Sequence, residues 1–287
     1  MNKIKLLTRF VPDEIMIRLL YFYRMHKVLH LKNPVLFSEK LQWLKLYNKR
    51  INDPRNTIMV DKKSAKDYVA AIIGETYIIP SLGVYDCFDE IEFDKLPNRF
   101  VLKCNHDSGG LVICKDKHAL NKVKAKEKIE KCLKANFYWH GREWPYNYIK
   151  PCIIAEQYIE DKEVGDLRDY KFFCFNGSVK CFKVDFDRFA GHKCIYYDRN
   201  KRPLPFSEAA FACENNVELE LPKAIDKMVE LAEKLSKEIP FVRVDFYCIN
   251  EQIYFGEMTL CPASGFGRFT SDEWDRRLGN WLELPKD

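Results

Sequence analysis

The sequence predicts an α+β protein in which helices come first and largely antiparallel strands follow. Apolar positions in the first 60 residues or so recur at helical spacing, whereas short apolar runs separated by Pro and Gly dominate after residue 77. Hydrophobic residues make up 47% and charged residues 31% of the chain, which is typical of a packed globular protein. The 287 residues therefore fill one large domain or two tightly joined ones.

Charge and cysteine content narrow the class of protein. The 47 Lys and Arg residues exceed the 42 Asp and Glu residues only slightly, so we expect no nucleic-acid partner, and a small anionic ligand suits the chain. The eleven cysteines are odd in number and include no Cys-x-x-Cys pair, which predicts reduced core thiols. No apolar stretch has the length of a signal peptide or membrane span, so we expect a cytoplasmic protein.

The N-terminal part is predicted to be helical. Leu41, Leu44 and Tyr47 recur at helical spacing behind Ser38, which is a candidate N-cap. A second helix is expected over residues 62–73, before Gly74. Peripheral contact of the aromatic and basic segment 18–32 with a membrane is an alternative, but its acidic and polar interruptions favour a packed helix.

The remaining elements follow from apolar runs and turn residues. Asn176-Gly177 is a strong hairpin signal, because both residues tolerate positive φ. Apolar residues on one helical face predict helices at 122–136 and after Pro222. Strands are expected at 77–79, 100–104, 111–114, 152–159, 170–175, 179–186, 193–197, 242–249 and 252–260.

A first candidate site follows the strand at 100–104. Lys103 stands near the end of this apolar run, and a loop with Ser108, Gly109 and Gly110 comes next. The lysine can reach a phosphate, and the backbone N–H groups of a glycine loop can close over it. An ordinary hairpin loop is the alternative, because the loop has neither common phosphate-binding pattern. For His106 in this loop, a structural hydrogen bond is favoured over catalysis.

A second candidate site lies in the last two strands. Glu257 and Thr259 project from one strand face, and Asp245 joins them if the hairpin contains a bulge or an odd-numbered turn. Two converging carboxylates suit Mg²⁺ whose coordination is completed by nucleotide phosphates. A solvated strand face, with Arg243 neutralising Asp245, explains the pattern equally well.

The third candidate is the apolar strand that runs into acidic residues at 153–160. Its backbone could pair with an adenine edge, and an acidic side chain beyond it could accept ribose hydroxyls. A plain edge strand is an equally good explanation.

Taken together and in order, several segments resemble the TupA-like ATP-grasp family, which is found among bacterial surface-polysaccharide genes. They are FSEKLQWLK at 37–45, VDKK at 60–63, IPSLGVYD at 79–86, LPNRFVLKCNH at 96–106, RVD at 243–245 and EMT at 257–259. The resemblance implies an ATP-grasp fold, in which nucleotide lies between two α+β subdomains. Here these would be residues 61–155 and 156–287, preceded by a helical segment at 1–60.

The resemblance also implies ATP and Mg²⁺ as cofactors and assigns roles to residues. It places nucleotide binding on Lys62, Lys103, Glu156, Gln157, Tyr158 and Ile159. The loop residues Ser108, Gly109 and Gly110 complete the expected nucleotide site. The metal would be held by Asp245, Glu257 and Thr259, where Thr259 replaces the usual Asn. Arg243 would stabilise developing charge, and Lys171 and His106 complete the candidate catalytic residues.

The function that the resemblance implies is that of an ATP-dependent ligase. It would activate a carboxylate as an acylphosphate and join it to an amine, on a sugar acid or a polysaccharide precursor such as capsule. Alternatives are a phosphotransferase that acts on a hydroxyl, a glycosyltransferase, and a non-catalytic nucleotide-binding module. A glycosyltransferase is disfavoured because no Asp-x-Asp lies in a suitable loop.

Overall fold

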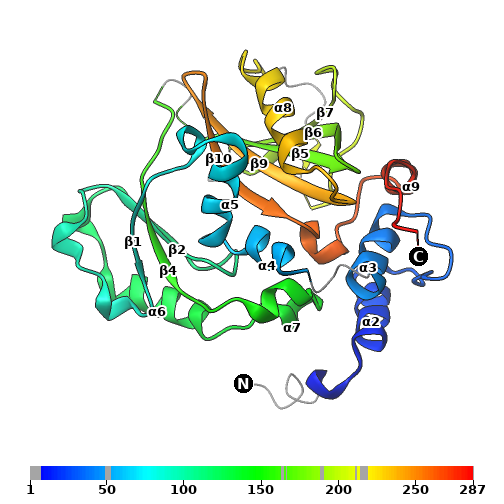
Figure 1. Cartoon of the computed structure of the whole chain (residues 1–287), viewed down its shortest axis with the longest axis horizontal. Helices are drawn as coiled ribbons and strands as arrows, with labels where there is room; N and C mark the ends of the chain where they lie inside the picture. The colour runs from blue at the N-terminus through cyan, green and yellow to red at the C-terminus, as the bar shows by residue number, and fades with distance from the viewer. Residues whose placement is uncertain are drawn as a thin grey trace.

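The computed structural model contains two sheets, each covered by helices, with a helical N-terminal part beside the larger sheet (Figure 1). It describes residues 8–48, 53–162, 165, 167–187, 191–210, 212–213 and 219–286. The α+β class predicted from the sequence is confirmed.

The smaller sheet has four antiparallel strands in the order β1-β4-β2-β3. They are β1 (Ser81–Tyr85), β2 (Phe100–Cys104), β3 (Leu111–Cys114) and β4 (Ile153–Gln157). Helix α6 (Lys122–Leu133) covers the sheet and buries Ile129 against Phe100 and Leu102. The predicted subdomain boundary between residues 155 and 156 falls inside β4.

The strand predicted at 77–79 is wrong. Glu75–Tyr77 form a 3₁₀ turn, and the first strand begins at Ser81, beyond Pro80. Tyr77 and Ile78 pack on the core of the larger sheet, so their apolar character reflects that contact rather than a strand.

The larger sheet has six strands in the order β10-β9-β5-β6-β7-β8, antiparallel except for the short β7–β8 pair. Asn176 and Gly177 turn the chain with φ of 48° and 81°, as the hairpin signal predicts. The strands are β5 (Asp169–Phe175), β6 (Ser178–Phe186), β7 (Lys193–Asp198), β8 (Ala212–Cys213), β9 (Phe241–Ile249) and β10 (Gln252–Thr259).

Most of the remaining helices pack on or beside the larger sheet. Those not yet named are α2 (Asp13–Met25), α3 (Phe37–Tyr47), α4 (Pro54–Val60), α5 (Ser64–Ile73), α7 (Tyr138–Gly141), α8 (Ile225–Leu235) and α9 (Asp272–Trp281).

The prediction that Ser38 is an N-cap is wrong, because α3 begins one residue earlier, at Phe37, and Leu36 is the residue before it. Its hydroxyl instead donates to Asp275 of α9 over 2.7 Å, which ties α3 to the C-terminal helix.

One face of the larger sheet is apolar throughout, and the other changes character along its length. Phe172, Phe182 and Val244 lie on the first face and pack under α5 and α8. On the second face, Phe173 and Phe241 pack with α3 and α9. Farther along the same strands, this face carries charged residues that line the cavity described below. This charged region forms one wall of the candidate site.

The described cysteine side chains are free thiols, as predicted from their number and spacing. Burial raises the pKa of Cys174 to about 12, so this thiol is unreactive at neutral pH. Among the described residues, no helix has the length and apolar character needed to cross a membrane.

Candidate functional site

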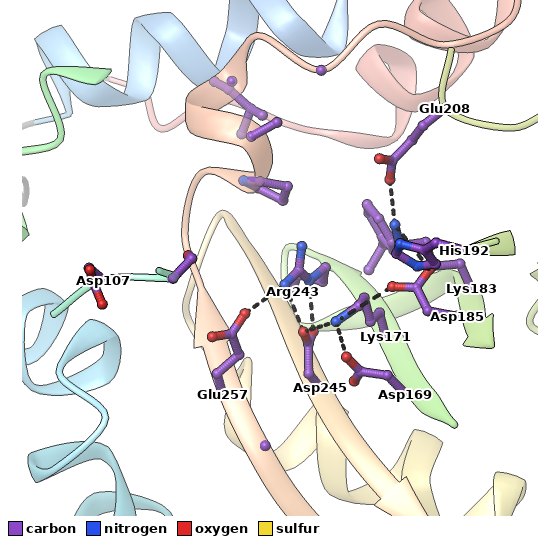
Figure 2. Close-up of a pocket in the computed structure, with 18 of the residues that line it drawn as sticks. Asp107, Asp169, Lys171, Lys183, Asp185, His192, Glu208, Arg243, Asp245 and Glu257 are labelled. Atoms are coloured by element: carbon purple, nitrogen blue, oxygen red, sulfur yellow. Dashed lines mark hydrogen bonds and ion pairs between the residues drawn. The ribbon is translucent and has the colours of Figure 1, made fainter. Parts of the chain in front are cut away.

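A cavity of about 370 Å³ lies between the two sheets and is lined by charged side chains from both (Figure 2). Lys103 comes from β2, Asp107 from the loop after it and Lys62 from the connection between α4 and α5, and strands β5, β6, β9 and β10 contribute the opposite wall. A second hollow of about 690 Å³, lined largely by apolar side chains, adjoins it and shares Lys103, Leu111 and Tyr247. The two spaces form one continuous cleft with a charged end and an apolar end.

The carboxylates of Asp245 and Glu257 share a face because of a β-bulge. A two-residue turn at Asn250-Glu251 pairs Ile249 with Gln252, and this register would place Glu257 opposite Val244. One extra residue, Gly256, shifts the pairing so that Glu257 lies opposite Asp245. A Cβ at Gly256 would lie 3.1 Å from the Asp245 carbonyl oxygen, so the bulge is tight enough to favour glycine.

Arg243 bridges the two carboxylates. Its Nε and Nη2 donate to Asp245 over 2.7 Å each, and Nη2 also donates to Glu257 over 2.9 Å and to the Thr259 hydroxyl over 3.1 Å. Burial favours the neutral form of Glu257, but the charges of Lys62, Arg243 and Lys171 outweigh it and hold its pKa at about 2. Glu257 is therefore ionised at neutral pH, and Arg243 joins it to Asp245.

Lys171 lies on the neighbouring strand and joins the same network. Its Nζ donates to Asp169 over 2.5 Å and to Asp245 over 2.7 Å. Burial lowers the pKa of this lysine, but Asp169 and Asp245 more than compensate and raise it above the ordinary value. Lys171 is thus a fixed positive charge in the cavity wall.

The two predicted phosphate-binding lysines reach the cavity from the other side. Lys62 donates to the Asp107 carbonyl over 2.7 Å and lies 3.7 Å from Glu257 Oε2. Lys103 is held by Glu156, whose carboxylate is 2.7 Å from its Nζ. Both lysines are partly exposed toward the cavity, so their charges remain available to an anionic ligand.

The side chain of Glu156 is buried between two lysines. Its second oxygen lies 2.6 Å from Lys66 Nζ, and only 3% of the residue is exposed. Burial raises its pKa, but Lys103 and Lys66 outweigh burial and lower the pKa below the ordinary value. The Glu156 side chain therefore positions Lys66 and Lys103. Only the backbone of Glu156 is left for the predicted adenine hinge.

The rest of the predicted hinge lines the apolar end of the cleft. Gln157, Tyr158 and Ile159 all border the 690 Å³ hollow, together with Val101 and Ile113. The guanidinium of Arg99 stacks 4.2 Å from the centre of the Tyr158 ring and pairs with Glu160, which fixes the segment that follows β4. The residues of the predicted hinge therefore lie together at the wall of this hollow.

The loop after β2 reaches the cavity only in part. Ser108 and Gly110 line it. His106 is 2% exposed, and its ring nitrogens contact Asn105 Oδ1 and the carbonyls of Cys132 and Ala135 near the end of α6. This geometry favours the structural hydrogen bond over catalysis for His106.

The sequence reasoning missed further charged residues of the cavity wall. Lys183 pairs with Glu208 over 2.6 Å, and Asp185 lies 3.4 Å from Lys183 and 3.6 Å from His192 (Figure 2). The sequence did contain a signal for these residues. In Lys183-Val184-Asp185, two charged residues stand two positions apart in an apolar strand, so they lie on one face, and that face must contact polar groups.

A strained turn closes the cavity next to β10. Ala263, Ser264 and Gly265 have φ of 49°, 54° and 71°, which is costly for the two residues with side chains. Buried Gln42 and Lys45 of α3 donate to the carbonyls of this turn over 2.7–3.2 Å. The N-terminal helical part therefore holds an element of the site in place.

We expect substitutions in this turn to have opposite effects on stability. Gly265→Ala would place a Cβ 2.6 Å from Gln42 Nε2 in a left-handed conformation, and should cost about 2 kcal/mol. Ala263→Gly relieves backbone strain and should stabilise the protein by up to about 1 kcal/mol. Urea unfolding of both variants checks this, and equal effects would contradict the assigned strain.

The carboxylate pair meets only part of the requirement for a metal site. No group of three or more His, Cys, Asp or Glu side chains in the described ranges could hold a metal ion. Asp245 and Glu257 with the Thr259 hydroxyl nevertheless offer hard oxygen donors on one face, which suits Mg²⁺ when phosphate oxygens supply the remaining ligands. These three side chains could therefore supply part of the coordination of a Mg²⁺ ion that binds as a complex with nucleotide.

The chain is similar to known proteins in sequence and in structure. The model of the TupA-like ATP-grasp family matches residues 39–283. Similar solved structures include D-alanine–D-alanine ligase of Helicobacter pylori, with 15% identity, a TM-score of 0.40, and coverage of 79% of this chain and 62% of that one. The corresponding ligase of Bacillus anthracis, complexed with ATP, has 16% identity, a TM-score of 0.42, and coverage of 78% and 63%.

Biotin carboxylase of Campylobacter jejuni, in an ATP complex, has 16% identity, a TM-score of 0.45, and coverage of 87% of this chain and 54% of that one. The present chain thus spans less than two thirds of the length of each of these three structures. No curated protein matches it.

Proposed function

This chain belongs to the TupA-like ATP-grasp family, and we propose that it is an ATP-dependent ligase that activates a carboxylate as an acylphosphate and joins it to an amine. We further propose a sugar acid or a precursor of a bacterial surface polysaccharide, such as capsule, as substrate. We propose that the reaction takes place in the cytoplasm, where ATP is available.

One observation carries the proposal. Lys62 Nζ donates to the Asp107 carbonyl in the loop after β2 and lies 3.7 Å from Glu257 of β10, so this cation stands between the loop of the smaller sheet and the carboxylate pair of the larger one. ATP brings about four negative charges, and phosphates inserted here would contact Lys62, Lys103 and Arg243. Catalysis would rest on positioning and charge neutralisation, without a protein nucleophile.

The proposed reaction has two steps. A substrate carboxylate oxygen attacks the γ-phosphorus, the bond to the β-phosphate oxygen breaks, and ADP leaves. The amine then attacks the acylphosphate carbonyl, and phosphate departs with the oxygen that came from the carboxylate. The amine loses a proton to the departing phosphate as the amide forms. Mg²⁺ held by Asp245, Glu257 and Thr259 would neutralise charge on the transferred group.

The far end of the cavity supports a polar acceptor. Lys183, Asp185, His192 and Glu208 place donors and acceptors next to one another there. Hydroxyl groups of a sugar acid can donate to the carboxylates and accept from the lysine at the same time. This alternation favours a hydroxylated substrate over an aliphatic one.

Removal of the Lys103 charge tests the phosphate contact. We expect Lys103→Met to weaken ATP binding about tenfold to a hundredfold, because a charge-assisted hydrogen bond contributes about 1.5 to 3 kcal/mol. Lys103→Arg should restore part of the affinity. Calorimetric titration with ATP and Mg²⁺ measures the change, and an unaltered affinity in the folded Met variant would exclude the contact.

The reaction itself is tested with substrate pools. The protein is incubated with ATP, Mg²⁺ and mixed uronic acids, with and without amines, and ADP and product masses are recorded. An amide product with ADP release that requires both an acid and an amine supports the ligase. A phosphorylated hydroxyl compound formed without an amine would instead show the phosphotransferase, and binding of a sugar nucleotide in place of ATP would show a glycosyltransferase.

A further inference from the structure

Helix α2 has a second apolar face, opposite the one that packs on the protein. Its inner face buries Ile17, Tyr21 and Met25. On the outer face, apolar side chains recur at spacings of four, three and one, which is one side of a helix. They are Ile15, Leu19, Phe22 and Tyr23, with exposed fractions of 52%, 58%, 63% and 77%.

Phe10 and Val28 flank the helix in the chain and are 84% and 64% exposed. These six residues, which we call the α2 patch, are six of the fifteen large apolar side chains that are exposed in the described part of the chain. Most of the others are spread over distant elements, whereas these lie within nineteen consecutive residues. Such a concentration is typical of a surface that contacts something apolar.

The patch is held rigidly. The Asp13 carboxylate at the start of α2 accepts from the Tyr138 hydroxyl over 2.7 Å and from Arg142 over 2.9 Å. The guanidinium of Arg9 stacks 5.1 Å from the centre of the Trp139 ring. These contacts orient the helix, which lies at the edge of the molecule next to α3 (Figure 1).

The charge around the patch selects its partner. Residues 8–32 contain five Lys or Arg and two Asp or Glu, and Lys27 also pairs with Asp272 of α9, so an excess of positive charge remains around this segment. In a symmetric dimer, the same patch on the second copy would offer apolar side chains but no excess of acidic ones. An anionic surface instead complements the basic residues and accepts the apolar ones between them.

We propose that the α2 patch binds the surface of an anionic lipid bilayer, with α2 lying in the plane of the membrane. The aromatic and aliphatic side chains enter the boundary between headgroups and acyl chains, and the basic residues of the segment contact the headgroups. The cleft stays open to the aqueous side. This inference concerns a different surface from the proposed ligase site and does not depend on that activity.

Vesicle sedimentation with the full chain tests the proposal. We expect binding to vesicles of equal parts phosphatidylcholine and phosphatidylglycerol, and at least about tenfold weaker binding to phosphatidylcholine alone. Leu19→Glu combined with Phe22→Glu should reduce binding to the anionic vesicles at least about tenfold, because it places charge in the apolar face. Val123→Glu combined with Tyr148→Glu is the matched control, since it adds the same charge at two exposed apolar positions elsewhere and should keep more of the binding.

A fluorescence measurement keeps the test independent of how well the glutamate variant folds. Phe22→Trp should be quenched by brominated phosphatidylcholine in the anionic vesicles, whereas Val123→Trp should not. Equal quenching at both positions, or equal loss of binding in both glutamate variants, would overturn the proposal. So would a dimer in light scattering that Leu19→Glu with Phe22→Glu dissociates while the wild-type protein ignores vesicles, because the patch would then bind a second copy.

Discussion

Asp245→Asn is expected to lower nucleotide turnover by about a hundredfold to a thousandfold, because it removes charge at the point where the transferred phosphoryl group would be stabilised. The same change should abolish the dependence of ATP binding on Mg²⁺. Calorimetry with ATP, in Mg²⁺ and in EDTA, measures this without knowledge of the acceptor. The wild-type protein should bind ATP more tightly in Mg²⁺, and the variant should show no difference.

Asp169→Asn is the matched control. Asp169 is buried and accepts a hydrogen bond from the same Lys171 as Asp245 does, but it lies opposite Asp185 rather than Glu257. Both substitutions should therefore cost stability, because each leaves Lys171 with fewer negative partners. Only Asp245→Asn should lose the Mg²⁺ dependence, and a loss in both variants would refute the assignment of the metal to the Asp245–Glu257 pair.

Glu156→Gln is expected to destabilise the protein by about 3 to 5 kcal/mol, since it leaves two largely buried lysines without their shared carboxylate. Lys66 and Lys103 lie 2.6 and 2.7 Å from that carboxylate, and it is 3% exposed. The change should also weaken ATP binding, because Lys103 loses the contact that orients it. Urea unfolding at neutral pH measures the effect on stability.

The pH dependence of this effect has a defined sign. The pKa of Glu156 is lowered from its ordinary value of 4.5, so its contribution to stability is complete above that pH and is lost in more acidic solution. The difference between wild type and Glu156→Gln should therefore shrink as the pH falls below about 4.5. Glu160→Gln, which breaks the partly exposed pair with Arg99, should cost no more than about 1 kcal/mol and is the control.

Most strands and helices could be predicted because their signals are local. Periodicity placed β2, β3 and α6, and the residue pair Asn176-Gly177 placed the β5–β6 hairpin. The same local patterns drew attention to Lys103 and to the Asp245 and Glu257 carboxylates. They could not place the first strand, because the apolar residues at 77–78 pack on the larger sheet instead of forming a ladder.

The candidate site was only half determined by the sequence. Residue types at short spacing indicated which side chains carry charge, but not which partners they meet. Glu156 illustrates this, since the linear pattern indicates a hinge beside adenine, while its side chain lies between Lys66 and Lys103. Lys66 is about 90 residues away from Glu156 in the chain, and no local rule connects them.

The sequence by itself determined the α+β class, most element positions, the reduced cysteines and the chemical character of the site. Only the tertiary structure decided that Asp245 and Glu257 face each other, because a single bulged residue at Gly256 sets the register. It alone decided that α3 holds the strained turn at 263–265 and that α2 keeps an exposed apolar face. The physical reason is that periodicity depends on neighbours in the chain, whereas register, ion-pair partners and burial depend on contacts between residues far apart in it.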